Sequence, residues 1–567
     1  MTIRSGNRVA GAALAELDRL LATANAPRKR ELLAVVATAR FVRARDLVRL
    51  QRAICFLTAF PEDGRVRGAA RVLADTFHDR VRRLPHAERA RLDDSGTAGT
   101  VTRHVYCASA AHWLARRFGA SVELDWPALS GDSVAALLAP SLHPLERDVL
   151  EFPTRTMRRW FERARGGRHG TALAWLLAQA PRNRDANERF QRDFDAAEVP
   201  LAWHLGDGPG SITRNRLRMH VAWRTGAMRR PGADVRAAIL QPLDSVQLLS
   251  RGAAARVLDV WRAALWSRTR TTLHVERPNL DECYLGDFGA GLQMAAIGIE
   301  SAARGVLEPS FGYLLMANGV PIGYGGFTPL FAQVNTGINV FPEFRGSEAA
   351  FAFEQALRLM HTLTGCVRFL VNPYQFGAGN DEALQSGAYW FYYRLGFRSA
   401  QSGVRRLAQR EFERLQADRR YRVPIAVLRR LAACDLHLDL TDDAARRGFD
   451  ENWLPALVGA IADASAGSGE PNRAAAQRKL AVQLARALRI DLATWSRHER
   501  AGLELFAPLL AQIEDLHGWP DRDKDALAQL CRARWATRER DYVGRMRDHD
   551  RLREAFARAA QRAAARA

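Results

Sequence analysis

A short basic turn between a strand-like segment and a helix-like segment carries the clearest chemical signal in the sequence. Residues 334–341 are apolar and extended in pattern, residues 342–347 form a turn that contains Arg345 and Gly346, and residues 348–363 have helical periodicity. The first N–H groups of a helix have no acceptor within the helix, and the positive end of the helix dipole lies beside them. Such a helix start favours a bound phosphate. The turn therefore predicts an anion-binding site.

A second segment with polar and aromatic residues follows this helix. Residues 367–371 are predicted to form a strand, Asn372 comes directly after it, and the loop 374–385 combines glycine, aromatic and polar residues. An aromatic helix then ends in residues 392–397, Tyr-Tyr-Arg-Leu-Gly-Phe. A loop of this composition at the mouth of a sheet is a reasonable substrate contact, and a simple excursion of the chain is the alternative.

Together these two parts resemble the cofactor-binding half of the GNAT superfamily of acyl-CoA N-acyltransferases, and the resemblance covers residues 271–425. The matching residues are Pro342, Phe344, Arg345 and Gly346 in the first part, and Asn372 and residues 392–397 in the second. The resemblance implies transfer of an acyl group from acetyl-CoA or another acyl-CoA to an amine on a small molecule or a peptide. It also implies that CoA is held by Val340, Phe341, Arg345, Gly346, Ser347, Ala349, Ala350 and Asn372.

One residue at the helix start departs from the family pattern. The family usually has a second glycine where this chain has Glu348. A carboxylate at a helix N-terminus interacts favourably with the helix dipole, but it repels a pyrophosphate that is bound there. Either Glu348 turns away from the site, or cofactor binding is altered or lost.

Acyl transfer requires few groups, and the resemblance implies which residues supply them. Backbone N–H groups at the end of the strand, at 339–341, are expected to polarise the thioester carbonyl. Tyr392 is expected to protonate the leaving thiolate, a task that suits a phenol with a pKa of about 10. Tyr393 would point about 100° away on the helix and is a poorer candidate. Packing in an aromatic core is the alternative interpretation of both tyrosines.

No residue of the sequence stands out as the base that deprotonates the amine. Glu382 in the long loop is the first candidate, and Asp381, His361 and Glu354 are further ones. An ordinary surface charge is the alternative interpretation of each of them. The base therefore stays open at the level of the sequence.

The elements that must position these residues are predicted from the periodicity of residues 271–425. Asn318-Gly319 lies between two apolar runs and is a strong hairpin signal. The predicted elements are a strand at 271–276, a helix at 291–303, and antiparallel strands at 312–317, 320–327 and 334–341. The predicted fold class is α+β, with a central GNAT-like mixed, mostly antiparallel sheet and helices.

Mainly helical regions are predicted on both sides of this domain. Residues 1–270 and 426–567 carry apolar residues at helical spacing, and residues 463–473 have the composition of a flexible linker. Residues 398–404 are predicted to form a closing strand, and residues 435–440 an edge strand or a turn.

Arginine dominates the charge of the chain. The 567 residues carry a formal net charge of +21, and only three lysines occur among them. Residues 531–567 alone contain 11 arginines against five acidic residues. A basic surface favours acidic partners, so nucleic acid stays open as a partner. The alternative explanation of the overall charge is a bias of the coding sequence toward arginine codons, and that of the C-terminal arginines is a helix whose charges simply face solvent. A second function hypothesis is therefore a catalytically silent GNAT-like scaffold that binds nucleic acid or a protein through arginine-rich helices. A third is an aminoacyl-tRNA-dependent relative of the fold.

Cysteine usage and hydropathy favour a soluble cytoplasmic protein. The six cysteines are scattered without a CxxC pair, which indicates neither a zinc site nor a disulfide framework. His437 and Asp439 are two candidate metal ligands without a third, so no metal is predicted. The N-terminus lacks the apolar core of a secretory signal, and no apolar run reaches the roughly 18 residues that a membrane span needs. We therefore expect a cytoplasmic location and no membrane contact.

Overall fold

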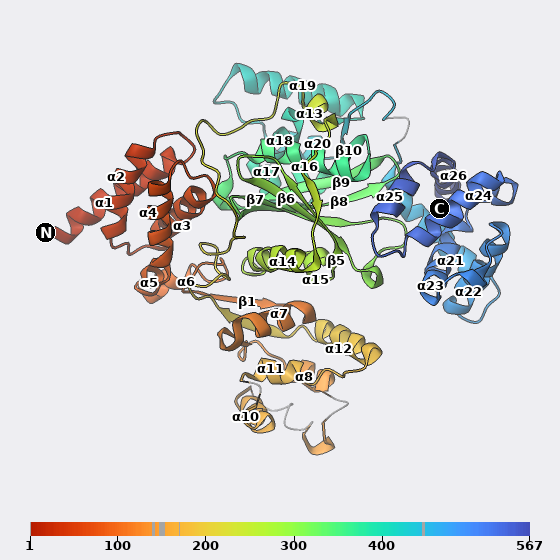
Figure 1. The fold of residues 1–567 in the computed structure, drawn as a ribbon, viewed down its shortest axis with the longest axis horizontal. Coiled ribbons are helices and arrows are strands. Elements are labelled where there is room, and N and C mark those ends of the chain that lie inside the picture. The colour runs from red at the N-terminus through yellow and green to blue at the C-terminus, as the bar shows by residue number, and fades with distance from the viewer. Residues whose placement is uncertain (1, 139–141, 147–153, 169, 445–447, 567) are drawn as a thin grey trace.

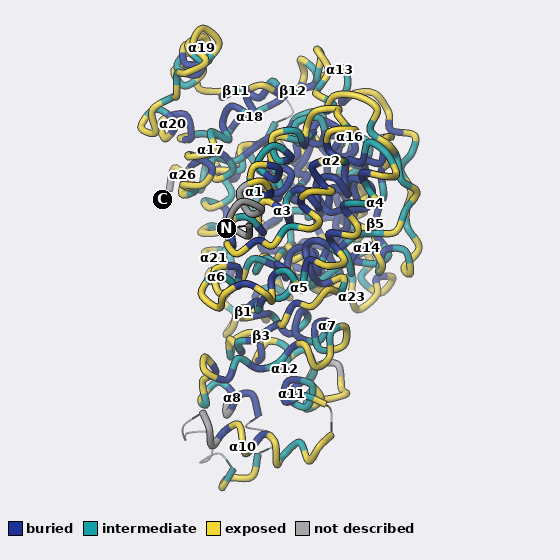
Figure 2. The backbone as a smooth tube through the Cα atoms, turned by 90° about the vertical axis from the view of Figure 1, so that its left-hand side faces the viewer, coloured by how far each residue is buried: buried dark blue, intermediate teal, exposed yellow. Residues whose placement is uncertain are grey.

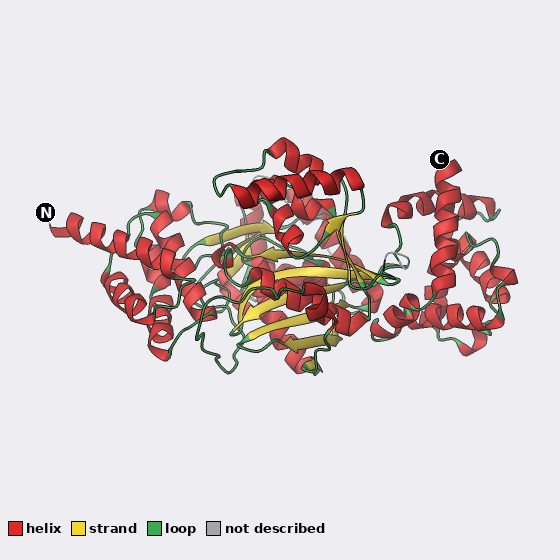
Figure 3. Cartoon of the chain, turned by 90° about the horizontal axis from the view of Figure 1, so that it is seen from above, coloured by secondary structure: helices red, strands yellow, loops and turns green. Residues whose placement is uncertain are grey.

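The computed structural model describes residues 2–138, 142–146, 154–168, 170–444 and 448–566. Figure 1 shows four groups of elements: helices at the N-terminus, a small sheet with helices, a central sheet with helices on both faces, and helices at the C-terminus. Viewed from above, the N-terminal and C-terminal helices lie at opposite ends of the central sheet (Figure 3). The helices together with a large, mostly antiparallel sheet confirm the predicted α+β class.

The first two groups precede the central sheet in the chain. The N-terminal helices are α1 (Thr2–Leu20), α2 (Ala26–Thr38), α3 (Ala44–Ala59), α4 (Gly64–Asp75), α5 (Phe77–Arg82) and α6 (His86–Ala90). The second group contains β1 (Val101–Val105), α7 (Ala108–Phe118), β2 (Val122–Leu124), α8 (Gly131–Leu138), α10 (Thr154–Arg165), α11 (Ala172–Leu177), α12 (Arg184–Ala196) and β3 (Pro200–His204). Its three described strands are antiparallel, in the order β1-β3-β2.

Nine strands of the described residues form the central sheet, in the order β11-β12-β10-β9-β8-β7-β6-β5-β4. They are β4 (Val246–Leu248), β5 (Pro278–Asp287), β6 (Leu292–Ile299), β7 (Phe311–Ala317), β8 (Val320–Leu330), β9 (Gln333–Val340), β10 (Arg368–Val371), β11 (Arg398–Ser399) and β12 (Leu436–Asp439). Neighbouring strands are antiparallel except for β9 and β10, which run parallel. The sheet thus extends beyond the predicted range of 271–425 at both ends, to β4 and β12.

Helices of the central group cover both faces of this sheet. They are α13 (Val235–Leu240), α14 (Arg251–Trp266), α15 (Leu273–Glu276), α16 (Ala349–Thr364), α17 (Asp381–Ser386), α18 (Ala388–Arg394), α19 (Ser402–Ala417) and α20 (Ile425–Leu431). Figure 1 places α16 on one face and α14 on the other. In Figure 2 the central strands and α16 are mostly buried, whereas α19 lies largely exposed on the outside.

Burial on both faces explains one of two wrong predictions. β6 and β7 are buried along their whole length. Such strands are apolar throughout and lose the alternation that identifies a half-buried strand. The helix predicted at 291–303 is therefore wrong, because a short continuous apolar run fits a buried strand and a buried helix equally well. The strand predicted at 271–276 is also wrong: its last four residues form the single turn α15, so six alternating residues were too few to decide.

The Asn318-Gly319 turn joins β7 and β8, as predicted. Both residues have positive φ, at 48° and 78°, which is what the hairpin turn of this type requires. The Asn318 side chain also donates to the carbonyl oxygen of Ala59 at 2.8 Å and accepts from the N–H of Ala222 at 2.8 Å. The hairpin therefore fixes the N-terminal helices to the central sheet.

The chain after α18 differs from the prediction in two places. Only the first two residues of the predicted closing strand 398–404 pair, as β11, because α19 already begins at Ser402. The segment 435–440 does contain a strand, but β12 lies between β10 and β11 and is not at the edge. The edge strand on this side of the sheet is therefore the short β11, and β4 is the edge strand on the other side.

The C-terminal helices have a hydrophobic core of their own. They are α21 (Leu454–Gly467), α22 (Arg473–Ala487), α23 (Arg497–Leu510), α24 (Asp521–Ala533), α25 (Arg540–Arg547) and α26 (Asp550–Arg566). This core, which includes Phe506, continues toward the central sheet through Leu307 and Phe331. Because α21 ends late, the linker predicted at 463–473 is shortened to residues 468–472.

Glu451 joins the start of the C-terminal region to the sheet. Its carboxylate accepts hydrogen bonds from the side-chain amides of Gln333 at 2.9 Å and Asn335 at 2.8 Å, both on β9. Burial raises the pKa of Glu451 to about 7, against the lowering effect of these two hydrogen bonds. The nearby carboxyls of Glu308 and Asp435 raise the pKa further.

The substitution Glu451→Gln is expected to change how stability depends on pH. The folded-state pKa lies above the ordinary value of 4.5, so the carboxyl contributes stability below about pH 4.5 that is lost as pH rises to about 7. Glutamine does not ionise and avoids this loss. The unfolding free energy of the variant relative to wild type should rise by about 1–3 kcal/mol from about pH 5 to about pH 8. Urea unfolding of both proteins at the two pH values measures this, and an unchanged difference would contradict it.

Candidate active site

The basic turn lies between the N-terminal helices and α16. Phe344 is buried, and its ring centroid is 6.5 Å from that of Phe60, which follows α3. Gly346 has φ of +82°, a left-handed conformation that glycine adopts without strain. The helix begins one residue after Glu348. The strand, turn and helix predicted over 334–363 are therefore confirmed.

The start of α16 presents free backbone N–H groups. The Ala352 N–H donates to the carbonyl oxygen of Glu348 at 2.8 Å and is the first of the helix to close a turn. The N–H groups of Ala349, Ala350 and Phe351 have no acceptor among the described residues. Both alanines are half-exposed, so these groups are open to an anion from solvent.

Glu348 turns away from this helix start. Its carboxylate accepts from the backbone N–H of Arg229 at 2.9 Å and from the Arg229 guanidinium at 2.9 and 2.7 Å. Its side chain is only 4% exposed and makes no capping hydrogen bond. The Arg229 guanidinium also lies 4.6 Å from the ring centroid of Phe351. Of the two alternatives, the first holds: the carboxylate is neutralised by Arg229 and leaves the anion position free.

The strands β9 and β10 diverge beside the helix start. Their parallel pairing covers only residues 333–335 and 368–370, whereas β9 continues for five residues more, to Val340. We call the space between the diverging strands the wedge. Ligands of sheets with parallel strands bind outside the carboxyl ends of those strands, and the wedge opens at the carboxyl end of both.

The N–H groups of β9 alternate between β8 and the wedge. The N–H of Phe341 donates to the carbonyl oxygen of Ile322 on β8 at 3.0 Å, so it is not available to a ligand. By the antiparallel pairing pattern, the N–H groups of Ile338 and Val340 then point to the wedge. That of Ile338 donates to the Tyr392 hydroxyl at 3.4 Å. Within the described residues that of Val340 has no acceptor.

Two side chains fill the wedge. The Gln375 side chain packs so closely on Gly337 that a Cβ at this glycine would collide with it. Tyr392 is buried against Phe353 and Phe376. Burial raises the pKa of Tyr392 well above its ordinary value, so the hydroxyl stays protonated and is a weaker acid than a free phenol. Its hydroxyl hydrogen meets no acceptor in the described part of the chain.

Arg345 and Glu382, predicted as separate site residues, form an ion pair. Nη2 of Arg345 lies 2.5 Å from Oε1 of Glu382, and both side chains are exposed. The hydrogen bond and the charge of Arg345, with a smaller effect of Arg270, lower the pKa of Glu382. A lowered pKa makes a weaker base, which argues against the predicted role of Glu382.

The other predicted residues are placed as follows. Glu354 is buried and accepts from the N–H of Gly232 at 3.1 Å, and His361 Nδ1 lies 2.8 Å from the carbonyl oxygen of Cys366. Both are thus engaged away from the wedge. Asn372 is the residue directly after β10, at the wedge. The oxygen of its side chain, Oδ1, is buried with no partner among the described residues.

Three residues near the turn carry no sequence signal for the site. Arg268 lies 4.2 Å from the ring centroid of Phe341 and 3.4 Å from Glu343, and Arg270 lies close enough to Glu382 to affect it. Both arginines follow α14. Arg229 belongs to a long connection with no periodicity, so its contact with Glu348 could not be predicted.

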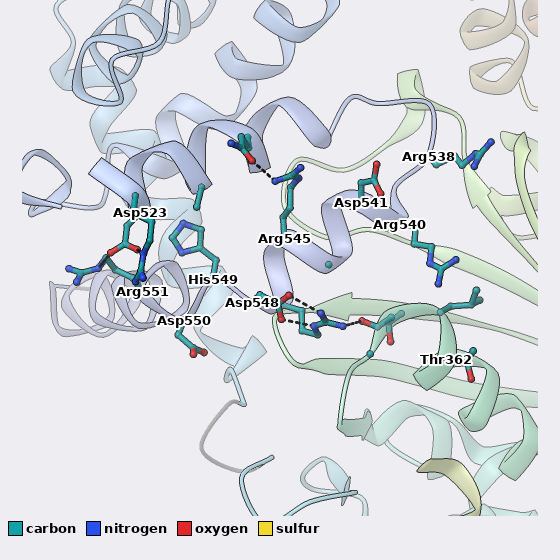
Figure 4. Close-up of a pocket in the computed structure, with 18 of the residues that line it drawn as sticks. Thr362, Asp523, Arg538, Arg540, Asp541, Arg545, Asp548, His549, Asp550 and Arg551 are labelled. Atoms are coloured by element: carbon teal, nitrogen blue, oxygen red, sulfur yellow. Dashed lines mark hydrogen bonds and ion pairs between the residues drawn. The ribbon is translucent and has the colours of Figure 1, made fainter. Parts of the chain in front are cut away.

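A second feature is a wide groove between the central sheet and α24, α25 and α26 (Figure 4). Its volume is about 1480 Å³. Its arginines are Arg522, Arg538, Arg540, Arg545, Arg547, Arg551 and Arg558. In the described part of the chain Arg538, Arg540 and Arg545 pair with no carboxylate, and Arg545 donates to the side-chain oxygen of Gln529 at 2.6 Å. Five acidic residues share the groove, so its positive charge is moderate.

Comparison of the sequence with family models and with curated proteins, and of the fold with solved structures, finds no match. Within the described residues there is no group of three or more histidine, cysteine or carboxylate side chains that could hold a metal ion. In the same residues, no helix combines the length and the apolar character that crossing a membrane requires. The function is therefore argued from the geometry.

Proposed function

We propose that this protein transfers an acyl group from an acyl-CoA thioester to an amine. The observation that carries the proposal is the combination of a free helix start with the N–H of Val340 at the end of β9, which is unpaired within the described residues. Three unpaired N–H groups begin α16, the carboxylate that would have blocked them is held by Arg229, and the wedge opens next to them. The proposal includes the GNAT-like character of the central domain, which the parallel pair β9–β10 within an otherwise antiparallel sheet supports.

The residues present fit an acyl-CoA substrate. The pyrophosphate would lie on the N–H groups of Ala349 and Ala350, with the Arg345 guanidinium beside it. The unpartnered Oδ1 of Asn372 is an acceptor for an amide N–H of the pantetheine arm. Binding requires the Gln375 side chain to leave the wedge.

Groups at the wedge would stabilise the oxyanion and protonate the leaving thiolate. The amine nitrogen forms a bond to the thioester carbon, the carbon–sulfur bond breaks, the nitrogen loses a proton, and the thiolate gains one. The Val340 N–H points to where the carbonyl oxygen becomes negative, and Tyr392 supplies the proton to sulfur. The amine must lose its proton to bulk water or to a group on the acceptor, because Glu382 is weakened as a base by Arg345.

Release of free thiol from acetyl-CoA tests the proposal. We expect thiol release that depends on an added amine, drawn from a panel of polyamines, amino sugars and peptide N-termini, together with an acetyl mass increment on the amine. Absence of amine-dependent thiol release across such a panel, while acetyl-CoA binds, would contradict catalysis and leave a binding scaffold.

The arginine-lined groove of Figure 4 supports a second candidate function, the binding of nucleic acid by the C-terminal region. Its volume admits an extended ligand, and Arg538, Arg540 and Arg545 have no carboxylate partner among the described residues. Contacts between arginine and phosphate give salt-dependent binding without sequence preference.

The double substitution Arg538→Glu and Arg545→Glu is expected to abolish such binding. It changes the charge of the groove by four units, and each lost phosphate contact reduces the slope of log affinity against log salt by roughly one. Fluorescence anisotropy with single-stranded RNA measures both quantities. The exposed Arg410 on α19 provides the control Arg410→Glu. Equal loss in the control would indicate a diffuse charge effect in place of the groove.

A further inference from the structure

A separate cavity of about 240 Å³ lies between α7, α14 and the connection that follows β3. Its floor is apolar and includes Trp113, Phe118 and Val260. The rings of Trp113 and Phe118 meet edge to face at a centroid distance of 5.4 Å, and Trp113 Nε1 donates to Asp259 Oδ1 at 2.7 Å. The floor is therefore held in place by ring packing and by a hydrogen bond. It shares no residue with the wedge or with the start of α16.

Four arginines line this cavity, and none of them pairs with a carboxylate among the described residues. They are Arg117, Arg216, Arg218 and Arg256. The carboxylate within the lining, Asp259, is already engaged by the indole of Trp113. Arg117, Arg218 and Arg256 are exposed, and Arg216 is half-buried. The cavity thus sets four positive charges against a single carboxylate in its lining.

More arginines lie behind the cavity. The pKa of Arg216, a half-buried residue, is lowered first by burial and then by the charges of Arg67, Arg214, Arg71 and Arg218. Of these, Arg214 is paired with Asp75. Like charges at this density repel one another, and a bound polyanion would remove the repulsion.

The segment that carries Arg216 and Arg218 is rigidly held. The Asn215 side chain is buried and donates to the carbonyl oxygen of Val260 at 2.8 Å. The Leu217 N–H donates to the carbonyl oxygen of Gly319 at 2.9 Å, and any side chain at Gly319 would collide with the Leu217 backbone. The two arginines therefore stand on a backbone fixed between α14 and the β7–β8 hairpin, which lowers the entropy lost on binding a ligand.

We propose that this cavity binds the polyphosphate group of a small organic or inorganic phosphate. Guanidinium groups form paired hydrogen bonds with phosphate oxygens, and four unpaired ones match a ligand with several phosphate charges. The volume of about 240 Å³ suits a compact group and not a long strand, and the apolar side chains of the lining offer a surface for a ring attached to the phosphates. A nucleoside triphosphate and inorganic tripolyphosphate share this chemistry.

Calorimetric titration of the full chain with ATP, tripolyphosphate and adenosine tests the proposal. We expect ATP and tripolyphosphate to bind and adenosine not to bind. Tighter binding of ATP than of tripolyphosphate would identify a nucleotide, and equal affinities would identify the phosphate chain alone. Arg256→Glu, at an exposed position on α14, should weaken binding about 10–100-fold, because it removes one charge-assisted contact and adds a repulsive charge.

Two further variants complete the test. Arg218→Glu, also exposed, should reproduce the effect of Arg256→Glu, whereas Arg410→Glu, at an exposed position on α19, should leave ATP affinity unchanged. This difference separates binding in the cavity from a diffuse charge effect. The proposal is overturned if wild type binds neither phosphate at low salt, if Arg256→Glu binds both as wild type does, or if only long RNA competes for the cavity.

Discussion

Replacement of Arg534 by alanine is expected to lower the free energy of unfolding by about 3–5 kcal/mol, because it leaves a buried carboxylate without its main partner. Arg534 and Glu539 are both 0% exposed and form an ion pair. The same guanidinium donates to the carbonyl oxygens of Gly305, Val306 and Glu308 at 2.5–3.2 Å. Truncation to alanine would leave the Glu539 carboxylate and these carbonyl oxygens without their guanidinium donor.

The buried pair belongs to a network that fixes the C-terminal helices to the sheet. The Glu282 carboxylate on β5 accepts from the N–H groups of Glu539 at 2.8 Å and Arg540 at 3.0 Å. Arg304 reaches Glu539 at 3.7 Å and donates to the carbonyl oxygen of Ala536 at 2.6 Å. Loss of Arg534 should therefore release the C-terminal region before the central sheet unfolds.

Urea unfolding of wild type and Arg534→Ala measures this effect. Arg522→Ala is the matched control, because Arg522 is 92% exposed and its pairing with Asp523 at 3.7 Å is worth little. The control should lie within about 0.5 kcal/mol of wild type. An Arg534→Ala variant of wild-type stability would contradict the role given to the buried network.

The substitution Tyr392→Phe is expected to reduce kcat for acyl transfer by about 10²-fold or more, which is the usual contribution of a general acid. The variant keeps the aromatic ring that packs on Phe353 and Phe376 and removes only the hydroxyl. That hydroxyl accepts from Ile338 and has its own hydrogen available for the leaving sulfur. Binding of acetyl-CoA should change little, so the effect should fall on kcat and not on KM.

Tyr393→Phe is the control for this prediction. Tyr393 is buried one position further along α18, and its ring packs under the Arg398 guanidinium at 3.6 Å. Removal of its hydroxyl should leave kcat within about threefold of wild type, since a surface or packing hydroxyl contributes little to the transition state. Equal rates in both variants would show that Tyr392 only packs in the core.

The parts of the fold that depend on local sequence were predictable. The turn with Arg345, the start of α16 and the Asn318-Gly319 hairpin each rest on a short signal: a basic glycine turn, a helical period, a pair of residues that tolerate positive φ. β6 lies in a range predicted as a helix, because the identity of a fully buried segment depends on what covers its two faces. No strand is predicted at β5, whose irregular burial gives no clean alternation.

The details that decide the site depend on contacts between distant parts of the chain. Glu348 does not repel an anion at the helix start because Arg229 binds its carboxylate. The two residues are 119 positions apart in the sequence, so no local pattern could predict this contact. Glu382 was predicted as a base, but its neighbour Arg345 lowers its pKa. Gln375 occupies the wedge through packing on Gly337, which no local pattern encodes.

Calorimetric titration with acetyl-CoA tests the central claim most directly, because the claim is that the start of α16 binds an anion. The proteins to compare are wild type, Ala350→Glu and its uncharged match Ala350→Gln. A glutamate in the first turn suits the helix dipole, so the fold should persist, but it should weaken the pyrophosphate contact about tenfold or more. We expect wild type and Ala350→Gln to bind acetyl-CoA, and Ala350→Glu to bind it about tenfold or more weakly. No binding by wild type, or equal binding by all three, would contradict it.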